Sequence, residues 1–288
     1  MMVSLLSMFA LGAARITSWP AVAAMVGGGT LVGAIGFVDD HRDLPAAWRL
    51  VAHFLAASWL LAWLGGLPDV SVWGVPITTG PIPLAIAAVY VVWVLNLTNF
   101  MDGIDGLAAM EATTVCGAGA LLCYLAVPRV STWMLPLFVA AAAAGFFAWN
   151  RPPARIFMGD AGSSFLGFMF AALALLTARE APPLFWSWTI LLGVFMVDAT
   201  TTLLRRLIRG ENVSSAHRSH AYQHAAVRYA AHGPVTFTAA AINVLWLLPI
   251  AWLVSRQQID GVAGLLLAYA PLTVLAVTLG AGVRGARS

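Results

Sequence analysis

The chain has 288 residues, of which 61% are hydrophobic and only 9% charged, and its mean hydropathy is +0.86. A soluble domain carries about 25% charged residues, so this composition excludes an ordinary soluble protein. The net charge of +3 comes from 15 arginines without a single lysine, which excludes chemistry that needs a lysine, such as a P-loop or a Schiff base.

Apolar stretches of roughly 17–25 residues, the length that crosses a bilayer, follow one another along the sequence. We therefore predict an all-α fold, a polytopic integral membrane protein of about ten transmembrane helices that forms one domain over residues 1–288. A β-barrel would instead show short alternating segments. The expected spans begin near Met1, Ala21, Ala46, Ile82, Ile104, Trp133, Ser163, Leu184, Val235 and Val262.

Arginine placement predicts the orientation of these spans. Cytoplasmic loops carry an excess of positive residues, and ten spans divide the arginines into eleven on one side and four on the other. The richer side is therefore expected to be cytoplasmic. Its arginines are Arg42, Arg49, Arg151, Arg155, Arg205, Arg206, Arg209, Arg218, Arg228, Arg284 and Arg287.

Polar side chains gather in four segments that the spans place on this same side. The segments are VDDHRDL (38–44), NLTNFMDGIDGLA (96–108), RIFMGDAGSS (155–164) and ENVSSAHRSHAYQH (211–224). Solvation alone does not sort carboxylates onto the side that is already rich in arginine, so we interpret the segments as one shared active site. Eight of the twelve acidic residues lie in or near them: Asp39, Asp40, Asp43, Asp102, Asp105, Asp160, Asp198 and Glu211.

The residue types in these segments suit a phosphate and a hard cation. Mg²⁺ is usually held by one or two carboxylates together with substrate phosphates. Helices that begin after DGIDG and GDAG would direct free N–H groups at a phosphate, and Arg218 could bind phosphate oxygens through two nitrogens. The expected oxygen ligands come from Asp39, Asp40, Asn99, Asp102, Asp105 and Asp160.

Each feature alone has a simpler explanation. DDHRD could be a solvated helix cap, and DGIDG could be a turn or a fragment of a calcium loop. Asp198 could have no role beyond a hydrogen bond with Thr202, one helical turn further along the chain. His217, His220 and His224 could hold Zn²⁺ if this segment is helical.

Taken together, Asp39-Asp40, NLTNFMDGIDGLA, FMGDAGS and HRSHAYQ resemble the motifs of the polyprenyl-phosphate N-acetylhexosamine-1-phosphate transferases of glycosyltransferase family 4. All four occur in the order of that family and over nearly the whole chain. HRSHAYQ is most similar to the branch that initiates O-antigen or capsule synthesis, and the peptidoglycan branch, with its phospho-MurNAc-pentapeptide transferases, is the second interpretation.

The resemblance implies a reaction, a cofactor and a location. A UDP-N-acetylhexosamine would donate its sugar-1-phosphate to undecaprenyl phosphate, giving undecaprenyl-diphospho-sugar and UMP. Mg²⁺ would be required, with Mn²⁺ as a candidate substitute. The protein would lie in the lipid bilayer of the bacterial inner membrane with its active site facing the cytoplasm. A homodimer is a candidate assembly, and no nucleic-acid partner is expected.

The resemblance also assigns roles to individual residues. Asp39 and Asp40 would act catalytically beside the attacking phosphate, as base or as nucleophile, together with Asp160. Asn99 and Asp160 would bind the metal, and Phe157 would stack on the uracil. The other expected substrate contacts are Asn96, Asp102, Asp105 at the base or ribose, and His217, Arg218 and His220 at the diphosphate and sugar.

Two alternatives to a transferase stay open. A divalent-cation or sugar-phosphate transporter would keep its carboxylates near the bilayer centre, whereas most carboxylates here are expected at helix ends. Members of the resembled family begin with an additional helix and a loop containing a PTPRGGG-like motif, and this sequence is expected to lack both. An inactive binding or scaffold protein is therefore the second alternative.

Overall fold

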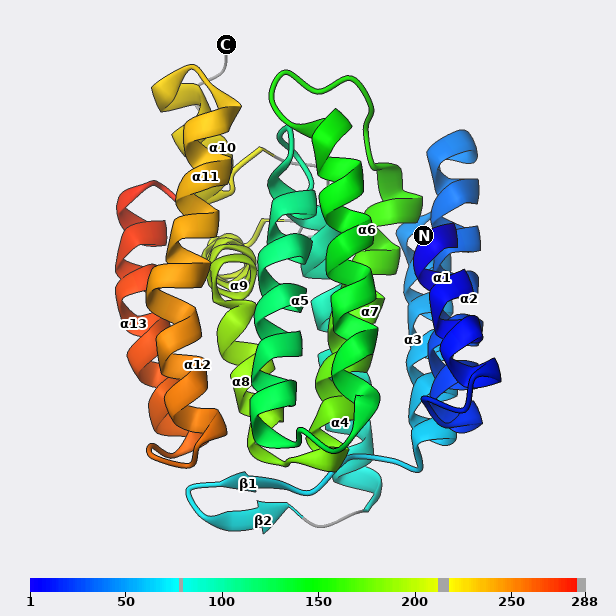
Figure 1. Cartoon of the computed structure of the whole chain (residues 1–288). Coiled ribbons are helices and arrows are strands. Elements are labelled where there is room, and N and C mark those ends of the chain that lie inside the picture. Colours follow the sequence, from blue (N-terminus) through cyan, green and yellow to red (C-terminus); the bar gives the residue numbers. More distant parts are fainter. Residues whose placement is uncertain (78–79, 212–217, 284–288) are drawn as a thin grey trace.

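The computed structural model describes residues 1–77, 80–211 and 218–283, which form a bundle of long helices with one small hairpin (Figure 1). The expected all-α membrane fold is confirmed. In chain order the helices are α1 (Met2–Ala13), α2 (Trp19–Arg42), α3 (Ala46–Leu64), α4 (Pro81–Phe100), α5 (Leu107–Ala126), α6 (Met134–Asn150), α7 (Gly159–Glu180), α8 (Pro183–Leu191), α9 (Gly193–Ile208), α10 (Ala221–Tyr229), α11 (His232–Ile242), α12 (Leu248–Ser255) and α13 (Gly261–Thr278).

The number of membrane spans is smaller than the sequence predicts. Each expected span corresponds to a helix that begins within about one helical turn of its expected start. However, α1 has only 12 residues, about 18 Å of helix, and a bilayer core is about 30 Å thick. Two further spans are longer than single elements: the turn Ser131–Trp133 continues into α6, and α11 continues through Asn243–Leu247 into α12. With these, the described residues hold eight helices that are long and apolar enough to cross a membrane, or nine if α8 and α9 form one broken span.

A β-hairpin, which the sequence analysis did not predict, closes the end of the bundle opposite α10 (Figure 1). Strand β1 (Val70–Val72) pairs antiparallel with β2 (Val75–Ile77). Trp73 and Gly74 form its two-residue turn, and both have positive φ angles of 52° and 76°. This is the backbone that a tight hairpin requires.

Helix α7 lies at the centre of the bundle and is buried along nearly all of its length. It packs against α2 on one side and α4 on the other. Apolar side chains such as Phe165, Phe168 and Met169 fill the space around it. The FMGDAGS segment enters α7 at Gly159. The packing of α7 therefore holds this part of the segment against the ends of α2 and α4.

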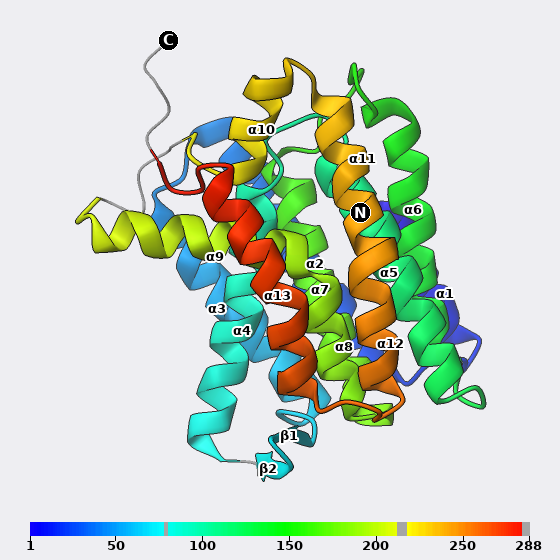
Figure 2. The same cartoon turned by 90° about the vertical axis from the view of Figure 1, so that its left-hand side faces the viewer.

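The segment from Leu184 to Arg209 is not one straight span. Its helix breaks at Leu192, and α9 turns by 70° away from α8. Figure 2 shows α9 lying across the bundle rather than along it. The polar stretch after α9 contains the short helix α10 and the beginning of α11.

Candidate active site

The structure brings three of the polar segments and the described part of the fourth to one end of the bundle. The end of α2 contacts the start of α7 through Asp40 and the backbone N–H groups of Asp160 and Ala161. Ser163 Oγ donates to Asn99 Oδ1 over 2.8 Å, which joins α7 to the end of α4. Segments that are more than a hundred residues apart therefore form one polar site, as the sequence analysis predicted.

The fourth segment joins this site through Tyr222 at the start of α10. Its hydroxyl donates to the carbonyl oxygen of Phe100 over 2.9 Å. Gly103 permits this approach, because a Cβ atom at Gly103 would collide with the Tyr222 hydroxyl. Tyr222 was not among the expected site residues, and its place is visible only in the folded chain.

Asp39 forms an ion pair with an arginine that the sequence analysis counted only for membrane orientation. Arg49 Nη1 lies 2.7 Å from Asp39 Oδ2 and 3.4 Å from Asp160 Oδ2. Asp39 is buried, and its other oxygen accepts from the backbone N–H of Leu44 over 2.7 Å. Arg49 thus neutralises part of the negative charge that Asp39 and Asp160 place together.

Asp40 caps the N-terminus of α7. Its two carboxylate oxygens accept from the N–H groups of Asp160 and Ala161 at 2.7 and 3.2 Å. The helix that was expected to begin after GDAG begins at Gly159 instead, and the N–H groups of Asp160 and Ala161 at its start bind Asp40 rather than facing a phosphate directly. Gly159 has φ +66°, and a Cβ there would come within 2.7 Å of Asp40 Oδ2.

Gly36 lets α2 approach the start of α7 backbone to backbone. A Cβ atom at Gly36 would lie 2.5 Å from the carbonyl oxygen of Asp160 and 2.6 Å from the N atom of Ala161. No rotation of a side chain can relieve such a contact, because its partners are main-chain atoms. This close approach places Asp39 and Asp40 next to Asp160.

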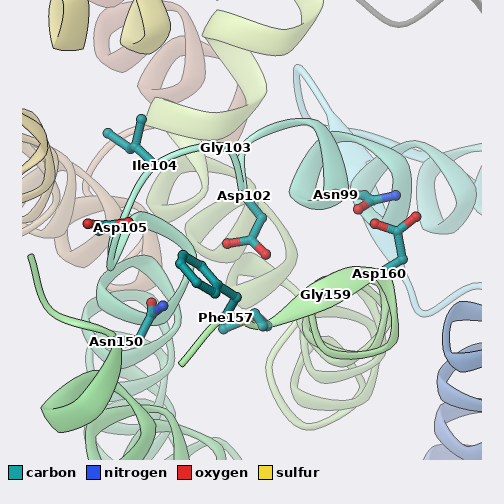
Figure 3. Close-up of a pocket in the computed structure, with 10 residues that line it drawn as sticks. Asn99, Asp102, Gly103, Ile104, Asp105, Asn150, Phe157, Gly159 and Asp160 are labelled. Atoms are coloured by element: carbon teal, nitrogen blue, oxygen red, sulfur yellow. The ribbon is translucent and has the colours of Figure 1, made fainter. Parts of the chain in front are cut away.

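A cavity of about 290 Å³ opens between the loop after α4 and the start of α7, and we call it the main cavity. Figure 3 shows Asn99 and Asp160 together at one side of it, Asp105 and Asn150 at the other, and Asp102 and Phe157 between them. The ring of Phe157 is 77% exposed, so one of its faces is available for a planar ligand. The main cavity is lined by Asn99, Asp102, Gly103, Ile104, Asp105, Asn150, Phe157, Met158, Gly159 and Asp160.

Asp102 lies among other carboxylates in this cavity. Burial, followed by the negative charges of Asp160 and Asp40, raises the pKa of the Asp102 carboxyl to about 7. A cation beside Asp102 would relieve this repulsion. The wall of the main cavity is therefore electrostatically suited to a positively charged ligand.

Asp105 and Asn150 shape the far side of the main cavity. The Asp105 carboxylate accepts from Ala154 N over 3.1 Å and lies 3.2 Å from His232 Nδ1. Asn150 is buried; it accepts from Gly106 N and donates to the carbonyl oxygen of Ile156. These contacts fix the loop that carries Phe157. The predicted contact of Asp105 with a base or ribose stays a prediction.

A second, smaller space of about 30 Å³ shares Asn99 and Asp160 with the main cavity, and we call it the inner pocket. Asn96, an expected substrate contact, lines this pocket and not the main cavity. Asn99 and Asp160 line both spaces. The inner pocket is lined by Ile35, Gly36, Asp39, Arg49, His53, Asn96, Asn99, Phe100, Asp160 and Ser164.

The oxygen donors at the junction of the two spaces fit Mg²⁺. Asn99 and Asp160 offer amide and carboxylate oxygens, and Mg²⁺ commonly takes one or two such ligands and completes its coordination with water and substrate phosphates. Among the described residues, no three His, Cys, Asp or Glu side chains form a complete metal site. A bound substrate would therefore have to supply further ligands.

The segment after α9 is only partly described, since His217 lies outside the described residues. Arg218 is exposed, whereas the His220 ring is buried with Nδ1 3.3 Å from Asp198 Oδ1. The described walls of the main cavity include neither of these two residues. Their expected contact with a diphosphate and sugar stays a prediction.

Asp198 makes more contacts than the single bond to Thr202 that its spacing suggests. That bond is present at 3.1 Å. The carboxylate also accepts from the backbone N–H groups of Ala221 and Tyr222, both at 2.9 Å, and faces His220. Asp198 of α9 thus holds the start of α10.

The zinc alternative finds no support in the described part of this segment. His220 faces Asp198, whereas the Nε2 atom of His224 lies 3.1 Å from the carbonyl oxygen of Val283. The two rings bind different parts of the chain and do not converge.

Comparisons with known proteins agree with this geometry. A family model described as glycosyl transferase family 4 matches residues 22–178, more than half of the chain. A probable undecaprenyl-phosphate N-acetylglucosaminyl 1-phosphate transferase of Bacillus subtilis is 31% identical over 201 residues, covering 67% of this chain and 55% of the relative.

Phospho-N-acetylmuramoyl-pentapeptide-transferases are also similar. The protein from Lactiplantibacillus plantarum is 31% identical over 190 residues, covering 60% of this chain and 56% of the relative. The protein from Streptococcus pneumoniae serotype 19F is 29% identical over 187 residues, covering 62% of this chain and 55% of the relative. The chain thus spans about half the length of the curated relatives it matches. By the family match over residues 22–178, this multi-pass membrane protein belongs to glycosyl transferase family 4.

Proposed function

We propose that the chain transfers an N-acetylhexosamine-1-phosphate from a UDP-sugar to undecaprenyl phosphate, releasing UMP and initiating O-antigen or another surface polysaccharide. The observation that carries this proposal is the meeting of two cavities at Asn99 and Asp160. Phosphoryl transfer needs its attacking and leaving oxygens roughly in line on opposite sides of the phosphorus. Donor and acceptor held in two spaces that share this polar pair would both bring their phosphates to it.

The main cavity supports binding of the nucleotide-sugar donor. Phe157 presents an exposed aromatic face, on which a uracil ring can stack, and stacking on a base contributes about 1–3 kcal/mol. Asp102 and Asp105 lie within reach of the same space and can accept hydrogen bonds from a base or ribose. The diphosphate would then extend toward Asn99 and Asp160.

In the proposed reaction, an oxygen of the lipid phosphate forms a bond to the sugar-bound phosphorus. The bond from that phosphorus to the bridging oxygen breaks, and UMP leaves with the electron pair. Such a phosphate monoester has its second pKa near 6, so it is mostly ionised at neutral pH. Asp39 and Arg49 would orient this phosphate, and Asp40 would keep the start of α7 in place.

Asn99 and Asp160 would hold Mg²⁺, which supplies positive charge for the phosphate oxygens while negative charge moves onto UMP. The ion would also offset the repulsion that raises the pKa of Asp102. Arg49, 3.4 Å from Asp160, adds a fixed positive charge at the same place. Charge neutralisation of this kind is a major source of catalysis in phosphoryl transfer.

We further propose that the polar end of the bundle faces the cytoplasm of a bacterial inner membrane. Of the thirteen arginines in the described residues, nine lie at this end or in α9 and α10, and four lie at the other end. Those at the opposite end are Arg15, Arg129, Arg179 and Arg256. The positive-inside rule supports this orientation.

The test is UMP release by purified protein given undecaprenyl phosphate, Mg²⁺ and a set of UDP-N-acetylhexosamines. Release that depends on both the lipid and one donor would support the proposal and identify the sugar. A transporter would move solute across sealed vesicles without releasing UMP, and a scaffold would bind nucleotide without turnover.

A peptidoglycan transferase is the second candidate function, because two of the similar proteins carry that name. The same assay separates the two, since UDP-MurNAc-pentapeptide would then be the productive donor.

A further inference from the structure

The inner pocket extends from the carboxylates of Asp39 and Asp160 to residues that lie further along the membrane-spanning helices. Along α3, His53 is one turn beyond Arg49, and along α4, Asn96 is one turn before Phe100. These residues come from the membrane-spanning helices rather than from loops. The inner pocket is therefore formed by membrane-spanning helices, whereas the main cavity is bordered in part by loops.

His53 has a property that the packing of the bundle does not explain. The residue is only 3% exposed, and its Nδ1 atom has no hydrogen-bond partner within 3.5 Å among the described residues, although Asn96 lies near enough to interact with the ring. A buried polar atom without a partner destabilises the folded state, because it has lost its hydrogen bonds to water. Such an atom in the wall of a pocket indicates a ligand that completes its hydrogen bonding.

The pocket's size and chemistry restrict the nature of this ligand. Its free volume of about 30 Å³ admits an oxygen-sized group or a water molecule, but not a sugar or a base. Arg49 and His53 both line the pocket, and both can donate hydrogen bonds, His53 when its proton is on Nδ1. A terminal oxygen of a phosphate fits between them.

We infer that the inner pocket receives a terminal oxygen of the acceptor's phosphate monoester, and that His53 binds this oxygen together with Arg49. This inference rests on the proposed function and deepens it, because it makes His53 a residue for the acceptor and not for the donor. The phosphate would lie beside Asp160 with its remaining oxygens directed toward the main cavity. Asn96 of α4 forms the adjoining wall.

The first experiment separates the two substrates by kinetics. His53→Leu removes the hydrogen bond and should raise KM for undecaprenyl phosphate about tenfold or more, with KM for the UDP-sugar unchanged. His53→Asn, whose amide nitrogen can replace Nδ1, should restore most of the affinity. Thr98→Val is the matched control, because buried Thr98 on α4 bonds only Val94 O of its own helix and lines neither space.

The second experiment needs no turnover. Undecaprenyl phosphate should raise the midpoint of thermal unfolding of the wild type and of Thr98→Val more than undecaprenol does, and His53→Leu should lose this phosphate-dependent difference. Inorganic phosphate serves as the other source of the same group. If inorganic phosphate alone gives the whole shift, the pocket binds free phosphate, and the assignment to the lipid acceptor is overturned.

The two experiments keep the inference and the proposed function apart. If the wild type releases no UMP with any donor but shows the His53-dependent shift with undecaprenyl phosphate, the transferase proposal fails and the phosphate site stands. If UMP is released normally and His53→Leu changes the KM values of donor and acceptor equally, or changes neither, the inference is wrong while the proposed function stands.

Discussion

Asp160 lies at the one place where the main cavity, the inner pocket and the Asp39–Arg49 ion pair meet. We expect Asp160→Asn to lower lipid-dependent UMP release by about 100-fold or more, because an amide is a weaker ligand for Mg²⁺ and removes a charge from the site. Asp69→Asn is the control, since Asp69 is exposed near the hairpin at the opposite end of the bundle. An Asp160→Asn protein with near wild-type turnover would contradict the proposed metal site.

Asp102 should make stability depend on pH. An unfolded aspartate loses its proton near pH 4, whereas folding raises the pKa of Asp102 to about 7. The folded state thus retains a proton that the unfolded state releases, so stability falls as pH rises from about 4 to about 7 and stays lower above that.

Asp102→Asn should remove this loss of folding stability, because an amide does not titrate in this pH range. In EDTA, the variant should therefore unfold at a higher temperature than the wild type at pH 8, and the difference should shrink toward pH 4. Mg²⁺ should narrow the difference at pH 8 by offsetting the negative charge. A difference that is the same at both pH values would refute the electrostatic explanation.

At the scale of secondary-structure elements, the packing of α2 against α7 positions the carboxylates of the site. Gly36→Ala places a methyl group against the backbone of Asp160 and Ala161, and overpacking of this kind costs about 1–3 kcal/mol. We expect a lower unfolding temperature together with weaker activity. Gly117→Ala on α5 is the matched control, because a Cβ there meets nothing within 4 Å; an equal loss in both variants would rule out the proposed clash.

Asp198 couples α9 to α10 and to the segment that contains Arg218. Asp198→Asn should loosen the start of α10, because an amide has one acceptor oxygen where the carboxylate accepts from the N–H groups of both Ala221 and Tyr222. Hydrogen exchange at these two amides should become faster, with a smaller effect in Thr202→Val, which loses a single bond. Unchanged exchange in Asp198→Asn would show that other contacts hold α10.

At the scale of the whole molecule, the orientation can be tested by labelling. Cys116 and Cys123 are buried, so the wild type should react little with a membrane-impermeant maleimide. We expect Gln258→Cys, exposed between α12 and α13, to be labelled in intact cells, and His41→Cys, exposed at the polar end, to be labelled only after the membrane is opened. The reverse pattern would place the polar end outside.

The sequence alone determined the membrane class, the positions of the long helices and the grouping of the four polar segments at one end. These properties follow from local hydrophobic runs and from the order of charged loops, both of which can be read along the chain. The spacing of motifs was sufficient to place Asp39, Asp40, Asn99 and Asp160 together, because antiparallel spans return the chain to the same face after every second helix.

Tertiary structure alone decided which of these groups touch. Arg49 was visible as a charge, but its position between Asp39 and Asp160 depends on the approach of α2, α3 and α7. The 70° turn of α9, the role of Asp198 and the unpartnered Nδ1 of His53 likewise depend on neighbours far along the sequence. Hydrophobicity indicates that a helix is buried, but hydrogen bonds and ion pairs form only within about 3–4 Å, and that distance is set by packing.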